Sequence, residues 1–295
     1  MTTYPERVLV LGVTGMVGNA MFQVLSENEN FITFGTGRKS MENNLPPPIN
    51  KNKIIHNVNV LDLDILLNVL NKVKPDVIIN CTGVIKQLSV SNDPLYVLPI
   101  NSIFPHRLSE ICKVAGIRLI QFGTDCSYSG KKGLYIESDS SDAKDLYGKS
   151  KYIGEIHNEK HVITIRTSTI GHEIETKNGL IEWFLGQEGS VKGFRQAMFS
   201  GLPTVEIARV VSQYIFPASD MHGLYHLSAS PISKYDLLLL VAKQYKKIIE
   251  IIPVDEPKID RSLDSSRFTD KTGYLAPGWP ELILAMHSYY NEGRS

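Results

Sequence analysis

A tyrosine and a lysine lie four residues apart in Tyr147-Gly-Lys-Ser-Lys151. On a helix this spacing places both side chains on the same face. The ammonium group of Lys151 can then lie near the phenol of Tyr147 and favour its ionised form. The pair could therefore serve as an acid or base near neutral pH, although the same spacing also arises easily by chance.

A glycine-rich loop runs from Gly12 to Gly18 and directly follows the apolar run 8–11. In such a loop Gly12 permits a tight turn, Gly15 lets the backbone approach a pyrophosphate, and Gly18 lets the next helix pack closely. The N-terminus of that helix supplies amide donors and partial positive charge. We predict a dinucleotide site, against the alternative of an ordinary glycine-rich turn. The loop residues predicted to bind the cofactor are Gly12, Thr14, Gly15, Met16, Val17 and Gly18.

Strand-like and helix-like segments alternate along residues 1–165. Strands are predicted at 8–11, 31–36, 54–60, 77–79, 119–122 and 162–165. Helices are predicted from the glycine loop to residue 25, at 61–73, at 105–115, and through Tyr147 to about residue 159. This alternation predicts an α/β fold with a doubly wound parallel sheet, that is, a Rossmann domain.

The alternation breaks down after Arg166, and residues 166–295 are interpreted mainly as a smaller substrate-binding lobe. Helices are predicted at 179–187, 205–216, 233–245 and 279–290. A strand at 224–227 is predicted to return to the main sheet, so that about 204–230 belongs with the Rossmann domain. No Gly/Ser linker separates the two parts, which predicts that they pack closely.

The end of the second predicted strand should decide which cofactor binds. An acidic residue there would bind the ribose hydroxyls of NAD, whereas an arginine suits the 2′-phosphate of NADP. The chain has Gly37-Arg38-Lys39 at this place and no acidic residue before Glu42. We therefore predict NADPH, bound by Arg38 and Lys39, with NADH as the alternative if these are only solvated loop charges.

Three further strand ends carry candidate residues. Asp62 follows the third strand, where an acid can reach the adenine edge or simply cap a helix. Small residues after the fourth strand could let the chain pass under the cofactor, or could form a packing turn. Thr124 follows the fifth strand, where its hydroxyl could bond a substrate carbonyl. The remaining cofactor-binding predictions are Asp62, Leu63, Cys81, Thr82, Gly83, Asn101, Tyr147 and Lys151.

Composition narrows the function classes. Lys plus Arg and Asp plus Glu number 31 each, so no basic surplus favours nucleic-acid binding. Three cysteines without CxxC spacing, and eight histidines without ligand spacing, predict reduced thiols and no metal site. We see no signal-peptide region and no apolar stretch of membrane-spanning length. A cytoplasmic protein without membrane contact is the prediction.

Several segments together resemble the extended short-chain dehydrogenase/reductase superfamily, in particular its dTDP-4-dehydrorhamnose reductase-like branch. The resemblance covers nearly the whole chain. It implies a catalytic triad of Thr124, Tyr147 and Lys151. The segments that carry it are Gly12 to Gly18, Phe122 to Gly130, Tyr147 with Lys151, Ser200-Gly-Leu-Pro-Thr204 and Asp260-Arg-Ser-Leu-Asp264.

The resemblance implies NADPH-dependent reduction of a nucleotide-linked 4-keto-6-deoxy sugar in surface-polysaccharide precursor synthesis. Tyr147 would donate the proton, Thr124 would add a hydrogen bond, and Lys151 would lower the pKa of the tyrosine. A homodimer is one assembly that we expect. The predicted substrate-binding residues are Lys86, Asp125, Cys126, Thr167, Lys192, Arg195 and Arg261.

Departures from the branch keep other readings open. Cys126 replaces a frequent aromatic residue, Thr169 replaces a tryptophan, and Ala20 replaces a glutamate that binds an interfacial metal in some members. The 4,6-dehydratases carry a second acid at the position of Cys126, and a thiol cannot serve as that acid. This difference disfavours dehydration as the reaction. The alternatives are an epimerase with tightly bound NAD(P), and a non-catalytic NADP-binding module. The chain is similar, more distantly, to the regulatory subunit of methionine adenosyltransferase, which is such a module.

Overall fold

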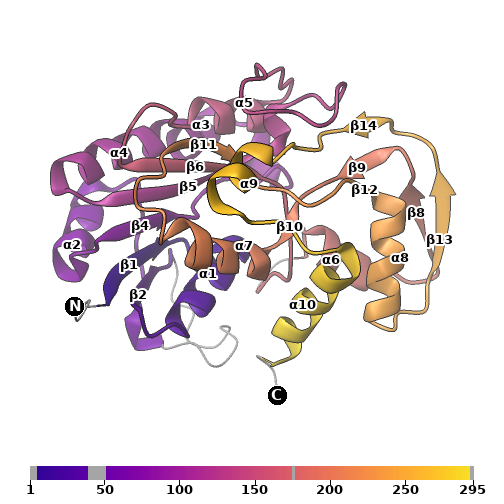
Figure 1. The fold of residues 1–295 in the computed structure, drawn as a ribbon, viewed down its shortest axis with the longest axis horizontal. Helices are drawn as coiled ribbons and strands as arrows, with labels where there is room; N and C mark the ends of the chain where they lie inside the picture. Colours follow the sequence, from indigo (N-terminus) through magenta and orange to yellow (C-terminus); the bar gives the residue numbers. More distant parts are fainter. Residues whose placement is uncertain (1–4, 39–50, 175–176, 293–295) are drawn as a thin grey trace.

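The computed structural model describes residues 5–38, 51–174 and 177–292, and a seven-stranded sheet lies at its centre (Figure 1). The strand order is β11-β6-β5-β4-β1-β2-β3, and all neighbouring strands are parallel. The order progresses outward from β1 in both directions, so a topological switch point lies between β1 and β4. The strands are β1 (Glu6–Leu11), β2 (Phe31–Thr36), β3 (Ile54–Ile55), β4 (Val77–Asn80), β5 (Arg118–Thr124), β6 (Val162–Thr167) and β11 (Gly223–His226).

Helices cover both faces of this sheet, because alternate side chains of each strand point to opposite sides. Val8 and Val10 belong to one buried cluster, whereas Leu9 and Leu11 belong to the other. A parallel strand with two covered faces needs apolar residues at every position, which explains the continuous apolar run. The covering helices include α1 (Met16–Ser26) and α7 (Thr204–Val210) on the first face, and α2 (Leu63–Val73) and α4 (Phe104–Ala115) on the second.

An almost continuous helical segment leads into α4. It begins with α3 (Pro94–Leu98), which the sequence did not predict, and continues through a π-helical turn, Pro99–Ile103. The predicted end of α4 is confirmed, because Gly116 has a φ of 68° and forms a left-handed cap. The short helix α5 (Leu146–Ile153) packs against this turn and against α3.

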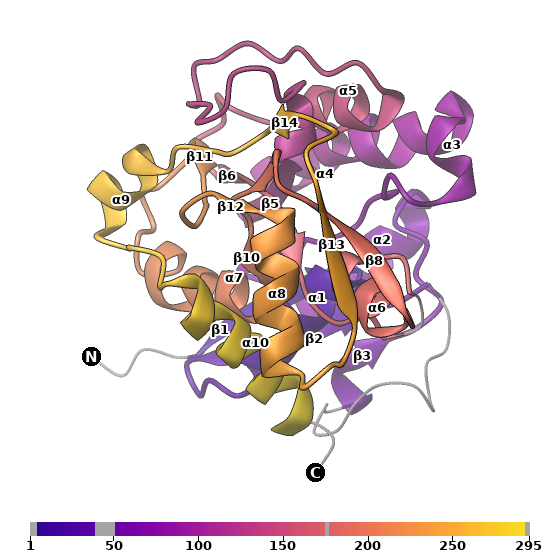
Figure 2. The same cartoon turned by 90° about the vertical axis from the view of Figure 1, so that its right-hand side faces the viewer.

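The residues after β6 form most of a second group of elements, which lies at the right of Figure 1 and faces the viewer in Figure 2. Its helices are α6 (Leu180–Leu185), α8 (Lys234–Gln244) and α10 (Trp279–Glu292), whereas α9 (Ser266–Thr272) lies nearer the centre of Figure 1 and contacts β11. Its strands are β7 (Thr169–Ile170), β8 (Ser190–Phe194), β9 (Ala197–Phe199), β10 (Leu202–Pro203), β12 (Ile232–Ser233), β13 (Glu250–Val254) and β14 (Ile259–Asp260). The strand predicted at 224–227 is β11, which pairs with β6. The division of the chain at residue 165 stays a prediction.

Two predicted elements are shorter in the structure. The third strand ends at Ile55 instead of residue 60, because Asn57 has a φ of 60° and turns the chain. The helix that carries Tyr147 ends at Ile153 instead of about residue 159. A Cβ at Gly154 would lie 2.0 Å from the carbonyl oxygen of Asn101, so the chain turns where it meets the π-helical segment.

Within the described ranges, no helix combines the length and the apolar character that crossing a membrane requires.

Candidate active site

The glycine loop joins the carboxyl end of β1 to α1, beside the switch point of the sheet. Gly12 has a φ of 86°, and its N–H donates to the carbonyl oxygen of Thr36 at 3.2 Å. A Cβ at Gly18 would lie 2.2 Å from the carbonyl oxygen of Gly12. Only glycine permits this approach, so the tight turn and the close helix packing that we expected are both present.

The N-terminus of α1 begins at Met16 with Gly15 as its cap residue. Gly15 is exposed, and no side chain in the described residues caps the helix. The first amides of α1 are therefore available to an anionic group, and the Gly15 position leaves room for it. Thr14 and Val17, on either side of Gly15 and Met16 in the chain, are partly exposed. These residues fit the pyrophosphate of a dinucleotide.

Arg38 lies directly after β2 and is exposed, with Nη1 3.5 Å from the phenol oxygen of Tyr96 on α3. Its position beside the glycine loop, at the end of the neighbouring strand, suits the ribose end of a dinucleotide. Lys39, predicted as its companion, lies outside the described residues.

Asp62 caps α2, because its Oδ1 accepts a hydrogen bond from the N–H of Ile65 at 3.1 Å. This is the capping role that the sequence left open. Leu63, the first residue of the helix, is exposed. The contact of Asp62 and Leu63 with adenine stays a prediction.

The turn after β4 passes close to both the glycine loop and α5. A Cβ at Gly18 would contact the Cys81 side chain at 3.2 Å, and a Cβ at Gly83 would lie 4.0 Å from Nζ of Lys151. Thr82 donates from its hydroxyl to Asn80 at 2.6 Å. The small residues of this turn thus connect the dinucleotide loop to the lysine of the Tyr-Lys pair.

Asn101 fixes the chain that follows this turn. Its Oδ1 accepts from the N–H of Val84 at 2.8 Å, and its Nδ2 donates to the Val84 carbonyl at 3.0 Å. Nδ2 also lies 3.2 Å from the hydroxyl of Ser150 on α5. Asn101 is buried in the π-helical turn, a rare geometry that recurs at functional sites. These hydrogen bonds join the β4 turn to α5, and the contact of Asn101 with the cofactor stays a prediction.

The start of α5 is held against the end of β5. Asp145 caps the helix by accepting from the N–H of Gly148 at 2.8 Å. A Cβ at Gly148 would lie 2.2 Å from the carbonyl oxygen of Cys126, so glycine is needed for the two segments to touch. Thr124 ends β5, and its Oγ1 accepts from the N–H of Cys126 at 3.2 Å.

These contacts bring the three predicted catalytic residues together. The Thr124 hydroxyl lies close enough to the Tyr147 phenol to act on it, and it lowers the pKa of the phenol against the effect of burial. Nζ of Lys151 donates to the carbonyl oxygen of Phe122 at 2.7 Å, two residues before Thr124. The expected grouping of hydroxyl, phenol and ammonium at one strand end is therefore present.

We expected Lys151 to lower the pKa of the Tyr147 phenol; the groups that act on this pKa most strongly in the structure are others. Burial, with a contribution from Cys126, raises the pKa of the Tyr147 phenol above its ordinary value. Burial lowers the pKa of Lys151, and its ammonium group points to a carbonyl oxygen. Tyr147 is therefore a protonated phenol near neutral pH, which is the state of a proton donor.

Four polar or charged side chains gather around this strand end. Burial raises the pKa of Asp125, opposed by the charge of Arg261, and raises the pKa of the Cys126 thiol to about 12. Nε of Arg261 donates to the carbonyl oxygen of Tyr128 at 2.7 Å. Nζ of Lys86 forms an ion pair with Asp145 at 2.7 Å. Both cations are close enough to act on Cys126.

The other predicted substrate residues are placed differently. Thr167 is buried at the end of β6, directly opposite Thr124 in the sheet register. Lys192 is exposed on β8, which pairs with β13 in the second group of elements. Arg195 follows β8 and forms a two-pronged ion pair with exposed Asp255 at 2.9 and 2.8 Å. No contact in the described residues joins Lys192 or Arg195 to the Thr124 region.

A buried polar network behind β5 was not predicted. Glu155 forms an ion pair with Arg166, and Arg166 also contacts the Tyr128 hydroxyl and, at 3.1 Å, Nε2 of His226. Burial lowers the pKa of His226 to about 4, so its ring is neutral. The available signal was Arg166 directly after the predicted apolar strand 162–165, since buried charges need partners.

Nothing in the described residues groups three His, Cys, Asp or Glu side chains in a way that could hold a metal ion.

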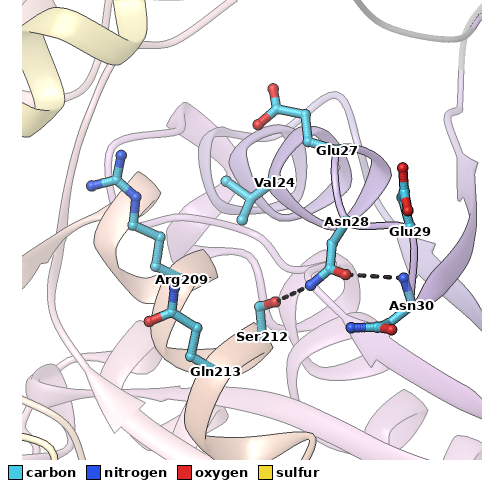
Figure 3. Close-up of a pocket in the computed structure, with 8 residues that line it drawn as sticks. All are labelled: Val24, Glu27, Asn28, Glu29, Asn30, Arg209, Ser212 and Gln213. Atoms are coloured by element: carbon cyan, nitrogen blue, oxygen red, sulfur yellow. Dashed lines mark hydrogen bonds between the residues drawn. The ribbon is translucent and has the colours of Figure 1, made fainter.

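A surface pocket of about 530 Å³ lies away from this site (Figure 3). It is formed by the turn between α1 and β2 together with α7 and the turn that follows α7. Asn28 donates to the hydroxyl of Ser212 at 3.2 Å across it. The pocket lies at the C-terminal end of α1, whereas the glycine loop lies at its N-terminal end.

The fold and the site define a Rossmann-type α/β protein with a Tyr-x-x-x-Lys pair beside its dinucleotide loop. The family model described as RmlD substrate binding domain matches residues 6–268. The chain belongs to this family.

Two curated proteins are similar to this chain. Methionine adenosyltransferase 2 subunit beta of Danio rerio is 26% identical over 265 residues, which cover 85% of this chain and 78% of that protein. The probable low-salt glycan biosynthesis reductase Agl14 of Haloferax volcanii is 24% identical over 147 residues, covering 50% and 46%. The chain spans about half the length of several curated relatives that it matches.

Solved structures share the fold over nearly the whole chain. dTDP-4-dehydrorhamnose reductase of Bacillus anthracis, solved with NADP, has a TM-score of 0.78 and 17% identity, covering 97% of this chain and 100% of that one. UDP-glucose 4-epimerase of Thermotoga maritima, solved with UDP-glucose, has a TM-score of 0.81 and 15% identity, covering 98% and 100%.

Proposed function

We propose that this protein reduces a nucleotide-linked 4-keto-6-deoxy sugar to the 4-hydroxy sugar with NADPH. The observation that carries the proposal is the grouping of Thr124, Tyr147 and Lys151 at one strand end, beside the turn that leads to the glycine loop. The family match and the structural likeness to a reductase solved with NADP support it. The name of the Haloferax relative supports a role in surface-polysaccharide precursor synthesis.

The glycine loop and the adjoining strand ends would hold the dinucleotide. The amides at the N-terminus of α1 bind its pyrophosphate, and Arg38 binds the 2′-phosphate. NADH would bind the same loop without the arginine contact. When bound, the cofactor supplies a hydride to the keto carbon of the sugar.

Tyr147 supplies the proton that balances the hydride. Its phenol donates the proton to the keto oxygen as negative charge develops there, so that the carbonyl becomes a hydroxyl group. Thr124 donates a hydrogen bond to the same oxygen, and this bond strengthens as the charge grows. The raised pKa keeps the phenol protonated before the reaction.

Lys151 binds the nicotinamide ribose and completes the site from the side of the β4 turn. Its ammonium group is already held at the Phe122 carbonyl and lies close to Gly83. An amine fixed in this way needs little ordering when the cofactor binds.

The sugar diphosphate requires cations near Tyr147, and Arg261 and Lys86 supply them. Nε of Arg261 donates to the carbonyl oxygen of Tyr128, and Lys86 forms an ion pair with Asp145. Cys126 borders the sugar as a neutral thiol. We place the reaction in the cytoplasm, in keeping with three free cysteines. A homodimer stays a prediction.

The test is the loss of reduced-nicotinamide absorbance with a panel of dTDP-, UDP- and GDP-linked 4-keto-6-deoxy sugars. Oxidation of NADPH that depends on one of these sugars supports the proposal and identifies the nucleotide. Purified protein that carries bound nucleotide and interconverts sugars without added NADPH would instead indicate an epimerase.

A second candidate is a non-catalytic NADP-binding subunit. The match to methionine adenosyltransferase 2 subunit beta, over 85% of the chain, favours it specifically. A pull-down that recovers a stoichiometric enzyme partner, from protein that binds NADPH but stays silent in the sugar panel, would support this candidate.

A further inference from the structure

A buried ion pair lies directly behind the proposed active site. Glu155 follows α5, and Arg166 lies in β6; both side chains are 1% exposed. Nε of Arg166 donates to Oε1 of Glu155 at 2.9 Å, and a second nitrogen donates to Oε2. His157 also lies 3.2 Å from Oε2. Both carboxylate oxygens are therefore fixed by hydrogen bonds.

The carboxylate of Glu155 touches the strand that carries the reacting groups. A Cβ at Gly123 would lie 2.5 Å from Oε1, so the oxygen occupies the space that a side chain would need. Gly123 lies between Phe122, whose carbonyl binds Lys151, and Thr124, which contacts Tyr147. Glu155 and Lys151 thus both contact residues 122–124 of β5.

Glu155 is the charged partner of Lys151. Burial lowers the pKa of Lys151, whereas Glu155 and Cys81 act in the opposite direction. Burial raises the pKa of the Cys81 thiol to about 12, so it carries no charge at neutral pH. Burial also acts to raise the pKa of Glu155, but hydrogen bonds from His157 and Arg166 outweigh it and keep the carboxylate ionised.

Among the described residues, Glu155 and Cys81 are the groups that act to raise the pKa of Lys151. The π-helical turn Pro99–Ile103 contains no titratable side chain. Asp125 and Cys126, in the turn after β5, act on Tyr147, which lies on the helix of Lys151 itself. On the far side of Glu155, the groups are Arg166 of β6, His157, and through Arg166 the side chains of Tyr128 and His226.

We propose that Glu155 is a positioning residue that acts through Lys151. Its carboxylate packs against Gly123. From this place it favours the protonated amine of Lys151 at the Phe122 carbonyl. Arg166 fixes the carboxylate in this place. The importance of that charge for NADPH binding rests on the proposed function, whereas the charge itself can be measured without turnover.

The test measures the protonation of Lys151 by competitive labelling with trace acetic anhydride across a pH series. Mass spectrometry of the Lys151 peptide gives the pH at which half of the amine is reactive. Glu155→Gln alone would leave Arg166 buried without an anion, so the informative variant is Glu155→Gln with Arg166→Gln. In this variant we expect the midpoint to fall by about 1 pH unit.

Two matched variants separate charge from packing. Glu155→Asp keeps the carboxylate, and Arg166→Lys keeps both charges while disturbing the same contacts; both should retain the midpoint of the unmodified protein. A folded double variant with an unchanged midpoint would overturn the proposal, as would an equal fall in Arg166→Lys. The pH above which NADPH affinity declines should move with the labelling midpoint. If the double variant shows the shift but the unmodified protein binds no NADPH, the proposed function is contradicted and the Glu155 inference stands.

Discussion

Lys151 donates a hydrogen bond to the carbonyl oxygen of Phe122 at 2.7 Å. This contact ties α5 to β5 two residues before Thr124. An isolated helix of eight residues would be unstable in water, so α5 depends on such tertiary contacts for its position. The placement of Tyr147 against Thr124 follows from this anchoring.

Replacement of the phenol tests its role as proton donor. Tyr147→Phe should lower the reduction rate by roughly 10²- to 10⁴-fold, because the proton would have to come from water. NADPH affinity, measured by fluorescence titration, should change little. Retained turnover in this variant would refute the assignment of the acid.

The glycine loop offers a matched pair of variants. Gly18→Ala should lower both thermal stability and NADPH affinity, because the added Cβ would lie 2.2 Å from a backbone oxygen. At Gly15 the nearest atom would be 3.5 Å away, so Gly15→Ala should keep the melting temperature and lose NADPH affinity alone. Equal NADPH affinity in the Gly15 variant and the unmodified protein would argue against a pyrophosphate at this loop.

Arg38 is expected to set the preference for NADPH. Arg38→Ala should raise the dissociation constant for NADPH by about 10- to 100-fold, the effect of losing a hydrogen bond between charged groups. The constant for NADH, measured in the same titration, serves as the control and should be nearly unchanged. An equal loss of affinity for both cofactors would show that Arg38 does not bind the 2′-phosphate.

The two arginine candidates for the substrate can be ranked. Arg261 lies beside Asp125 and Cys126, whereas the guanidinium of Arg195 is already engaged by Asp255. Arg261→Ala should therefore weaken binding of a nucleoside diphosphate more than Arg195→Ala, as isothermal titration calorimetry with dTDP and UDP would show. The reverse order would move the diphosphate site toward β8.

The buried histidine predicts how stability depends on pH. The folded-state pKa of His226 is lowered to about 4 from an ordinary 6.5, because burial and Arg166 disfavour its charged form. The unfolded chain then binds more protons between these values, so stability should be complete above about pH 6.5 and decline as the pH falls toward 4. The contribution is about 3 kcal/mol. His226→Gln should flatten this part of the urea-unfolding profile; an unchanged slope would show that other groups cause it.

Local patterns made much of the fold predictable. The apolar run before Gly12 and the glycine spacing predicted β1, the loop and the start of α1, because each depends on neighbours in the chain. Thr124 could be placed at the carboxyl edge of the sheet, where ligands bind, and its pairing with Tyr147 came from the resemblance to the superfamily.

The remaining features depend on contacts between distant residues. The early end of α5 follows from the approach of Gly154 to Asn101, which no local pattern records. The raised pKa of Tyr147 follows from burial, with contributions from Cys126, Asp125 and Asp145. The Glu155–Arg166 pair exists only because β6 lies beside the end of α5.

The most direct test of the central claim traces the transfer of the hydride from NADPH to the sugar. The protein is incubated with NADPH deuterated at the transferred position and with each 4-keto-6-deoxy sugar nucleotide of the panel, and the sugar is analysed by mass spectrometry and NMR. The account predicts one deuterium at C4 of the sugar, with the label lost in Tyr147→Phe along with turnover. Sugar that is converted without deuterium, or recovered unchanged while NADPH is bound, would contradict it.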